Sequence, residues 1–162
     1  MHVNLSFYTD GAYSSASKRG GWSCLAVEQT EDGKENLLAV QSGSEDMTTN
    51  NRMELSGFIC ALDTINKLNT YEDATLTIYT DSAYIANCIN EKWYENWRKN
   101  GWRTSDKRPV KNQDLWGNII SLYIRVSNKY ANLKIVKVKA HEGNKWNNAA
   151  DLYAVKARKE VK

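Results

Sequence analysis

Proline, cysteine and histidine are scarce in this sequence, which has one Pro, three Cys and two His among 162 residues. The cysteines, Cys24, Cys60 and Cys88, form no CxxC pair and no Cys/His pattern. Neither a disulfide framework nor a zinc site built on such motifs is therefore expected. Each cysteine lies in an apolar stretch, which indicates reduced core thiols in a reducing compartment.

Long apolar runs are absent, and no charged-then-apolar leader opens the chain. A soluble cytoplasmic protein with no membrane partner, monomeric by default, is therefore expected. The composition is 41% hydrophobic and 25% charged, and the mass is 18.5 kDa. These values suit one globular domain over residues 1–162, long enough to bury a sizeable core.

The positive charge is concentrated in one segment, residues 92–111, which reads KWYENWRKNGWRTSDKRPVK. Seven Lys/Arg stand there against two acids, a local charge of +5, which leaves −2 for the rest of a chain of net charge +3. A basic block on a mildly acidic body favours a polyanionic partner. The tryptophans in this block indicate either a buried helix face or a platform for sugars and phosphates.

Hydrophobic periodicity predicts three strands, then helices alternating with two more strands. The expected strands cover about 2–9, 22–27, 36–42, 74–80 and 133–139. The expected helices begin at Asn51 through a capping-box pattern with Glu54, cover 82–90, start after a cap at Asn112, and close the chain over 147–159. A meander followed by α/β crossovers predicts an α/β fold with a mixed five-stranded sheet, antiparallel and parallel, flanked by helices.

Two nearly identical hexapeptides, YTDGAY at 8–13 and YTDSAY at 79–84, each place an aspartate where a predicted strand stops. If the two strands are parallel neighbours, Asp10 and Asp81 meet at one rim of the sheet. Glu54, predicted in the first turn of a helix, and Asp151, early in the last helix, are further candidates. Clustered carboxylates repel one another unless a cation joins them, and oxygen ligands favour Mg²⁺ or Mn²⁺ over zinc.

Each acid also has a simpler interpretation. An aspartate after a strand is commonly a turn or cap residue. An acid such as Glu54 near a helix start is favoured by the helix dipole, and Asp151 suits a surface position. Spacing alone leaves both interpretations open.

Five ordered motifs resemble type 1 ribonuclease H, and the likeness runs from about residue 7 to 157. The motifs are YTDGA (8–12), TNNRMEL (49–55), YTDSAY (79–84), NWRKNGWRTSDKRPVKNQDLW (96–116) and VKAHEGNKWNNAADLYA (138–154). The resemblance implies the ribonuclease H-like fold, with residues 92–111 as a basic protrusion. It also implies hydrolysis of the RNA strand of RNA/DNA hybrids with two divalent ions, Mg²⁺ or Mn²⁺, and with little sequence preference.

The resemblance also implies roles for individual residues. Asp10, Glu54, Asp81 and Asp151 would be metal ligands, with Asp10 bridging both ions, and His141 would assist water activation, proton transfer or product release. The implied substrate contacts are Gly11, Thr49, Asn50, Asn51, Trp97, Arg98, Lys99, Trp102, Arg103, Trp116 and Asn147. In particular, Asn50 and Asn51 would reach the minor groove of the hybrid, and the basic segment would hold the DNA strand.

The segment 12–21 departs from the family, because it carries Lys18 and Arg19 where relatives have a Gly/Pro/Asn-rich loop. Ser14, Ser15 or Ser17 could replace the contacts of a family asparagine there. Three other classes of protein are alternatives: a non-catalytic nucleic-acid-binding module, an aspartyl-nucleophile phosphatase and a transposase or integrase core. The first predicts loss of an acid, the second a further Asp two residues from Asp10, and the third lacks such a protrusion.

Overall fold

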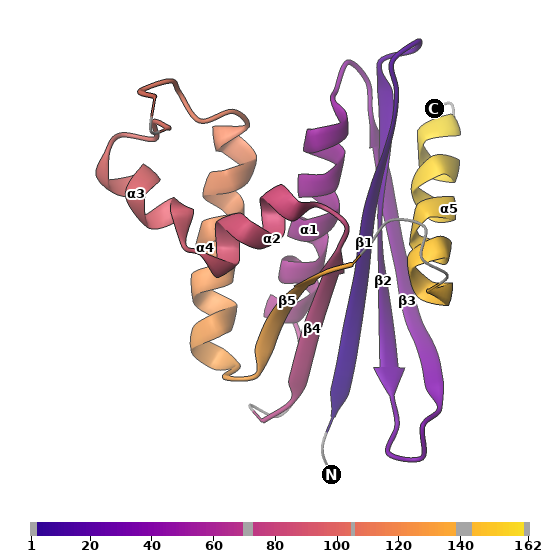
Figure 1. The fold of residues 1–162 in the computed structure, drawn as a ribbon. Helices are drawn as coiled ribbons and strands as arrows, with labels where there is room; N and C mark the ends of the chain where they lie inside the picture. The colour runs from indigo at the N-terminus through magenta and orange to yellow at the C-terminus, as the bar shows by residue number, and fades with distance from the viewer. Residues whose placement is uncertain (1–2, 70–72, 105, 139–143, 161–162) are drawn as a thin grey trace.

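The computed structural model describes residues 3–69, 73–104, 106–138 and 144–160. Its centre is a five-stranded sheet with the strand order β3-β2-β1-β4-β5 (Figure 1). Antiparallel pairing joins β1 to β2 and β2 to β3, whereas β4 pairs in parallel with β1 and with β5. The strands are β1 (Asn4–Ser14), β2 (Arg19–Gln29), β3 (Glu35–Glu45), β4 (Thr75–Thr80) and β5 (Leu133–Lys137). The predicted mixed sheet is confirmed.

Helices cover both faces of this sheet (Figure 1). They are α1 (Asn50–Asn66), α2 (Ala83–Asn90), α3 (Trp93–Lys99), α4 (Gln113–Lys129) and α5 (Lys145–Lys159). Two successive glycines of β2 show that α1 and α5 lie on opposite faces, because successive strand residues point to opposite sides. A Cβ on Gly20 would meet Met53 of α1, whereas one on Gly21 would meet the α5 backbone at Ala154 and Arg158.

Each face of the sheet has its own apolar cluster. The larger joins the sheet to α1, α2 and α4, and its fully buried members include Phe7, Phe58, Leu62, Ile78 and Trp116. The smaller lies beneath α5 and consists of Tyr8, Leu25, Val27, Trp146 and Ala150. Burial on both sides of the sheet explains why the central strands are apolar on both faces. No helix in the described part of the chain is long and apolar enough to cross a membrane.

The prediction that the first strand stops at Asp10 was wrong. Strand β1 continues to Ser14, and its antiparallel pairing with β2 extends to Ser14↔Arg19. The parallel pairing of β1 with β4 does stop early, at Tyr8↔Tyr79. The β2 partner satisfies the backbone of β1 beyond the end of β4, so the expected loop at 12–21 is reduced to a short turn.

Two helix starts also differ from the prediction. Thr49 caps α1, because its hydroxyl accepts a hydrogen bond from the Arg52 N–H at 3.2 Å, and Glu54 consequently lies in the second turn. Asn112 precedes α4 in the N-cap position but makes no side-chain cap bond. A short helix, α3, occupies part of the basic segment and buries Trp97, which agrees with the helix-face interpretation of the tryptophans there.

Candidate active site

The two YTD segments lie side by side in register on β1 and β4. Tyr8 pairs with Tyr79, and their rings stack with centroids 4.7 Å apart. The Thr9 hydroxyl donates a hydrogen bond to the Tyr79 carbonyl at 3.2 Å. Asp10 and Asp81 each follow the paired tyrosines by two residues, so this register brings both carboxylates to the place where β4 ends.

Gly11 allows α1 to approach β1 closely enough to bring Glu54 to the same place. A Cβ on Gly11 would lie 2.6 Å from the Glu54 backbone nitrogen and 2.8 Å from the Met53 carbonyl carbon. The Gly11 N–H also donates to Asp10 Oδ1 at 2.8 Å, which orients that carboxylate. Gly11 therefore helps to place both acids. Its lack of a side chain lets Glu54 approach, and its N–H orients the Asp10 carboxylate.

Asp151 reaches the site from the opposite face of the sheet. Asp10 pairs with Ser23 across the β1–β2 ladder, and the Ser23 hydroxyl donates to the Ala150 carbonyl at 2.6 Å. This buried hydrogen bond holds the second turn of α5 against β2, the strand that pairs with β1 beside Asp10. The helix is capped by Asn144, whose side chain accepts hydrogen bonds from the N–H groups of Trp146 and Asn147.

The four acids line one polar cavity of about 200 Å³. Its lining residues are Asp10, Gly11, Asn50, Glu54, Asp81, Asn147, Asn148 and Asp151. Carboxylate oxygens of Asp10, Glu54 and Asp81 all lie within 4.8 Å of one another. Oε2 of Glu54 is buried and has no hydrogen-bond partner among the residues that the structure describes. A hard, oxygen-only donor set with an unsatisfied buried carboxylate oxygen fits a divalent cation such as Mg²⁺ or Mn²⁺.

Burial and mutual repulsion shift the pKa values of two of these acids. Desolvation and the neighbouring charge of Asp81 raise the pKa of Asp10 to about 7, although the Gly11 N–H opposes the shift. Desolvation, followed by the charges of Asp81 and Asp10, raises the pKa of Glu54 to about 10. Both acids therefore favour the protonated form unless a cation compensates their charge.

These shifts predict that, without divalent cations, stability falls as the pH rises. The unfolded chain loses the Asp10 proton near its ordinary pKa of 3.8, whereas the folded chain keeps it until about pH 7. In that window the unfolded state binds fewer protons, so the free energy of unfolding decreases with pH. Glu54 acts in the same direction between pH 4.5, the ordinary value of its pKa, and about pH 10, the value of its pKa in the folded chain.

Urea unfolding at about pH 5 and about pH 8, with and without Mg²⁺, measures this dependence. Glu54→Gln should reduce the loss of stability between the two pH values, and Mg²⁺ should stabilise the wild-type protein more at the higher pH. If the free energy of unfolding depended equally on pH in the wild type and the variant, ionisation of Glu54 would not destabilise the fold.

Among the predicted substrate contacts, Gly11, Asn50 and Asn147 line this acidic cavity. Asn51 lines another cavity of about 480 Å³, together with Arg108 and Lys111 of the basic segment. Arg103 lines another cavity of about 400 Å³ together with Tyr84, Trp93 and Trp97, and the Trp97 side chain is buried. Arg98 and Lys99 are exposed in the last turn of α3, Trp102 is half-buried, and Thr49 is exposed beside its cap bond. His141 lies outside the described residues.

The expectation of a direct substrate contact by Trp116 does not fit its position. Its side chain is fully buried and packs edge-on against the rings of Tyr84 and Trp97. The sequence could not show that Trp116 is buried. A tryptophan near several cations gives the same local pattern whether its ring packs in the core or contacts a ligand. Trp116 supports the aromatic residues that line the neighbouring cavity.

Sequence reasoning did not single out Asn148 or Arg52. Asn148 lines the acidic cavity one residue after Asn147, so the NKWNN stretch is the signal that could have identified it. Arg52 lies inside the TNNRMEL motif, but its partners are far along the chain. No local pattern identifies those partners.

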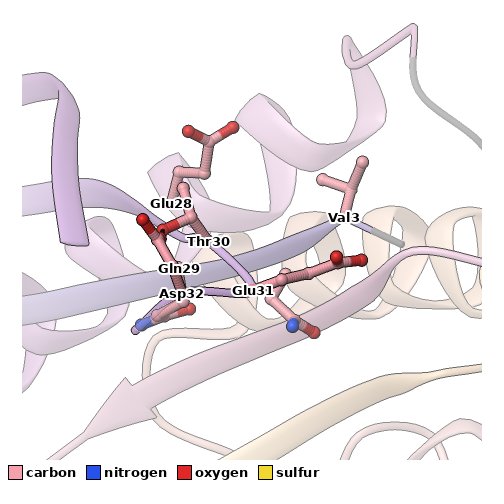
Figure 2. A pocket seen from close by; sticks show the side chains of 7 residues that line it. Val3, Glu28, Gln29, Thr30, Glu31 and Asp32 are labelled. Carbon is pink, nitrogen blue, oxygen red and sulfur yellow. Dashed lines mark hydrogen bonds between the residues drawn. The ribbon is translucent and has the colours of Figure 1, made fainter. Parts of the chain in front are cut away.

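Another cavity lies at the opposite end of β1, beside the β2–β3 hairpin (Figure 2). It measures about 350 Å³ and is lined by Val3, Asn4, Glu28, Gln29, Thr30, Glu31 and Asp32. Within the described residues its acids do not form a metal-ligand cluster of three converging side chains. It contains none of the predicted site residues, so the acidic cavity at Asp10 remains the candidate active site.

The strand order and the converging carboxylates define an α/β protein with an acidic site, able to hold a metal ion, beside the central strand β1 where β4 ends. The RNase H family model matches residues 2–159. The chain belongs to the RNase H family and is a ribonuclease H enzyme. This confirms the resemblance inferred from the sequence motifs.

Individual relatives match nearly the whole chain. The ribonuclease H of Caldicellulosiruptor saccharolyticus is 39% identical over 155 residues, 96% of each protein. That of Chlorobaculum parvum is 38% identical over 160 residues, 99% of each. LC9-RNase H1, a type 1 RNase H with the type 2 active-site motif, is 25% identical with a TM-score of 0.77, over 98% of this chain and 73% of that one. LC11-RNase H1, solved in complex with an RNA/DNA hybrid, shares the fold at 21% identity and a TM-score of 0.65, over 95% and 96% of the two chains.

Proposed function

We propose that this enzyme cleaves the RNA strand of RNA/DNA hybrids endonucleolytically, leaving 5′-phosphate and 3′-hydroxyl ends. The observation that carries the proposal is the convergence of Asp10, Glu54 and Asp81 within 4.8 Å in a cavity that Asp151 also lines. We further propose that residues 1–162 act as one ribonuclease H domain, monomeric and cytoplasmic, with 92–111 as its basic protrusion.

Asp10, Glu54, Asp81 and Asp151 would hold two divalent ions, with Asp10 shared between them. Such ions supply activation of water and stabilisation of charge on the attacking and leaving oxygens of a phosphodiester. The chain contributes a fixed geometry, because the Gly11 N–H orients Asp10 and the β1–β4 register places Asp81 beside it. His141 would assist the movement of the proton and the release of product.

Selectivity for a hybrid follows from two surfaces with different chemistry. Asn50 and Asn147 line the acidic cavity, and their amides can bond to 2′-hydroxyl and phosphate groups of the RNA strand. On the other surface, Arg98, Lys99 and Arg103 would hold the DNA strand through its phosphates. Contacts of this kind read sugars, shape and charge, so little sequence preference is expected.

Labelled hybrid, duplex DNA and duplex RNA, incubated separately with the purified enzyme, test the proposal. Cleavage of only the RNA strand of the hybrid, dependent on Mg²⁺ or Mn²⁺ and stopped by EDTA, is expected. Analysis of the product ends should show 5′-phosphates. Equal cutting of the three substrates, or activity that persists in EDTA, would contradict the proposal.

Replacing both Arg98 and Lys99 by Ala should weaken binding of the hybrid mainly through lost phosphate contacts. Each lost contact lowers the slope of log K against log salt by roughly 0.7–0.9, so a decrease of about 1–2 is expected. Lys34→Ala/Lys67→Ala removes the same amount of charge from exposed ion pairs outside the basic segment and is the matched control. A change in maximal rate with an unaltered salt slope would argue against the phosphate contacts.

A further inference from the structure

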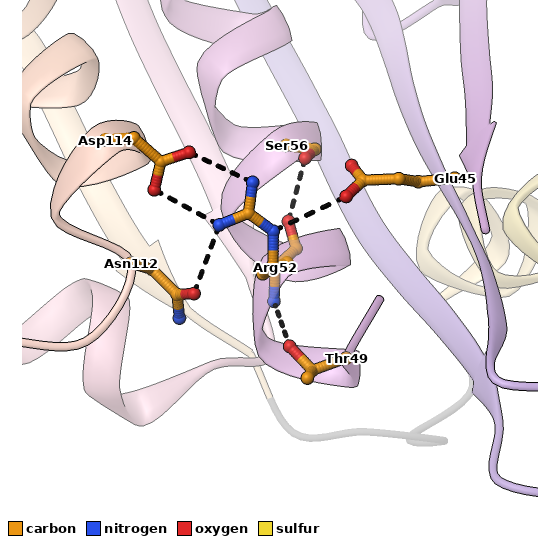
Figure 3. Close-up of polar contacts among 6 residues, drawn as sticks. All are labelled: Glu45, Thr49, Arg52, Ser56, Asn112 and Asp114. Atoms are coloured by element: carbon orange, nitrogen blue, oxygen red, sulfur yellow. Dashed lines mark hydrogen bonds and ion pairs between the residues drawn. The ribbon is translucent and has the colours of Figure 1, made fainter. Parts of the chain in front are cut away.

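Arg52 makes side-chain contacts with three residues from two other parts of the chain (Figure 3). Its guanidinium donates two hydrogen bonds to the Asp114 carboxylate, at 3.1 and 3.0 Å, in a two-pronged pair. It also donates to Asn112 Oδ1 at 3.3 Å, and its Nε lies 3.5 Å from Glu45 Oε1. Because a guanidinium group is planar, these contacts with three side chains restrict the orientation of the Arg52 side chain.

These contacts join segments that carry different parts of the proposed site. Arg52 lies in the first turn of α1, directly after Asn51 and two residues before Glu54. Asn112 and Asp114 begin α4, immediately after the basic segment 92–111. The Arg52 side chain therefore connects the helix that bears a catalytic carboxylate with the end of the segment proposed to hold the DNA strand.

The backbone of Asn112 indicates that this connection is built into the start of α4. Asn112 has a φ of 59°, in the left-handed region that residues other than glycine seldom adopt. Asn112 occupies the N-cap position, but its side chain makes no cap bond, and its side-chain oxygen Oδ1 accepts a hydrogen bond from Arg52 instead. Arg52 also holds the pKa of Asp114 below its ordinary value, chiefly through their hydrogen bonds.

Residues of both segments line one cavity of about 480 Å³. They are Asn51, the neighbour of Arg52, and Arg108 and Lys111 of the basic segment. Lys111 precedes Asp114 by only three residues. The Arg52–Asp114 pair therefore joins the two segments close in sequence to the residues of each that line this cavity.

We propose that Arg52 is a positioning residue that fixes the basic segment relative to Asn51 and Glu54, so that a hybrid held by both surfaces presents its RNA strand to the carboxylates. It acts through Asn112 and Asp114 and needs no contact with the substrate itself. The inference rests on the proposed function for the identity of the substrate. The apolar packing of α1 and α4, which includes Phe58, Trp116 and Ile119, does not depend on this polar bridge. Loss of the bridge should therefore change binding more than folding.

Arg52→Gln and Asp114→Asn break the bridge from its two ends, and a series of hybrids of decreasing length separates the two surfaces. On a hybrid long enough to touch both, each variant should raise KM and Kd about ten-fold, the scale expected for coupled residues, with kcat nearly unchanged. On hybrids too short to reach the basic segment, variants and wild type should be alike. Arg52→Lys should restore part of the loss, because Lys keeps the charge but not the fork.

A double-mutant cycle tests whether Arg52 acts through the basic segment. Arg52→Gln combined with the Arg98→Ala/Lys99→Ala variant should weaken binding of the long hybrid by less than the product of the separate effects. Lys67→Gln removes a cation from another exposed ion pair of α1, with Asp63, and should leave both hybrids unaffected.

Multiplicative effects in the cycle, or equal losses on long and short hybrids, would overturn the positioning role. Measuring Kd beside cleavage keeps the two proposals distinguishable. A wild-type protein that binds the hybrid but does not cut it contradicts the proposed activity, while the Kd cycle still decides the role of Arg52. A fall in unfolding free energy that accounts for the binding loss would also overturn the inference.

Discussion

Asp10→Asn is expected to reduce hybrid cleavage by on the order of a thousand-fold or more, because loss of charge stabilisation at the reacting phosphate costs several kcal/mol. Asp10 lies at the centre of the acidic cluster, with Glu54 and Asp81 within 4.8 Å and Asp151 lining the same cavity. An amide in its place cannot hold two cations by a shared negative charge. The variant should nevertheless fold, since an Asn oxygen can still accept the Gly11 N–H.

The same substitution should increase stability in the absence of divalent cations above about pH 7. The fold disfavours the ionised form of Asp10, because the pKa of this carboxyl rises from 3.8 to about 7. Its ionisation therefore lowers the free energy of unfolding by at most on the order of 4 kcal/mol. Loss of activity together with gain of stability is a result that simple misfolding cannot produce. The two measurements therefore separate a functional role of Asp10 from a structural one.

Asp63→Asn is the matched control, because Asp63 is an exposed acid of α1 in an ion pair with Lys67. It should leave cleavage unchanged. Single-turnover cleavage with Mg²⁺, and urea unfolding in EDTA, give the two quantities for each variant. If Asp10→Asn retained wild-type cleavage, Asp10 would not belong to the active site.

Gly11→Ala is expected to lower both stability and activity. The added Cβ would lie 2.6 Å from the Glu54 nitrogen and 2.8 and 2.9 Å from atoms of Met53, so α1 must move away from β1. Overpacking of this kind typically costs about 1–3 kcal/mol of folding free energy. The movement also displaces the Glu54 carboxylate from Asp10 and Asp81, and cleavage should fall even where the variant is fully folded.

Gly117→Ala provides the control for an added methyl group. Gly117 lies in α4, and a Cβ there meets no atom within 4 Å. Replacing a helical glycine by alanine typically stabilises by about 0.5–1 kcal/mol. Denaturant unfolding and cleavage of both variants below their transitions measure the difference. A Gly11→Ala protein with unchanged stability would show that β1 and α1 can separate without cost.

Local patterns identified the strands and most of the helices, and they marked the four acids as candidates, while the resemblance to ribonuclease H supplied their expected role. Alternation at Val3, Leu5 and Phe7 identified a strand, and the repeated YTD segments identified Asp10 and Asp81 as equivalent positions. The parallel register of Tyr8 with Tyr79 agrees with that expectation. These features follow from side-chain periodicity, which is a property of neighbouring residues and can be read along the chain.

The sequence by itself determined the mixed α/β fold, the four acids and the position of the basic segment. Tertiary structure alone decided that β1 continues past Asp10, that Trp116 faces the core and that Arg52 joins α1 to α4 across 62 residues. Each of these depends on a partner that is distant in sequence: β2 supplies backbone hydrogen bonds beyond the end of β4, and aromatic neighbours enclose Trp116. Strand length, burial and long-range pairing depend on contacts with such partners in the folded chain. A local pattern indicates only the conformational preference and polarity of each residue.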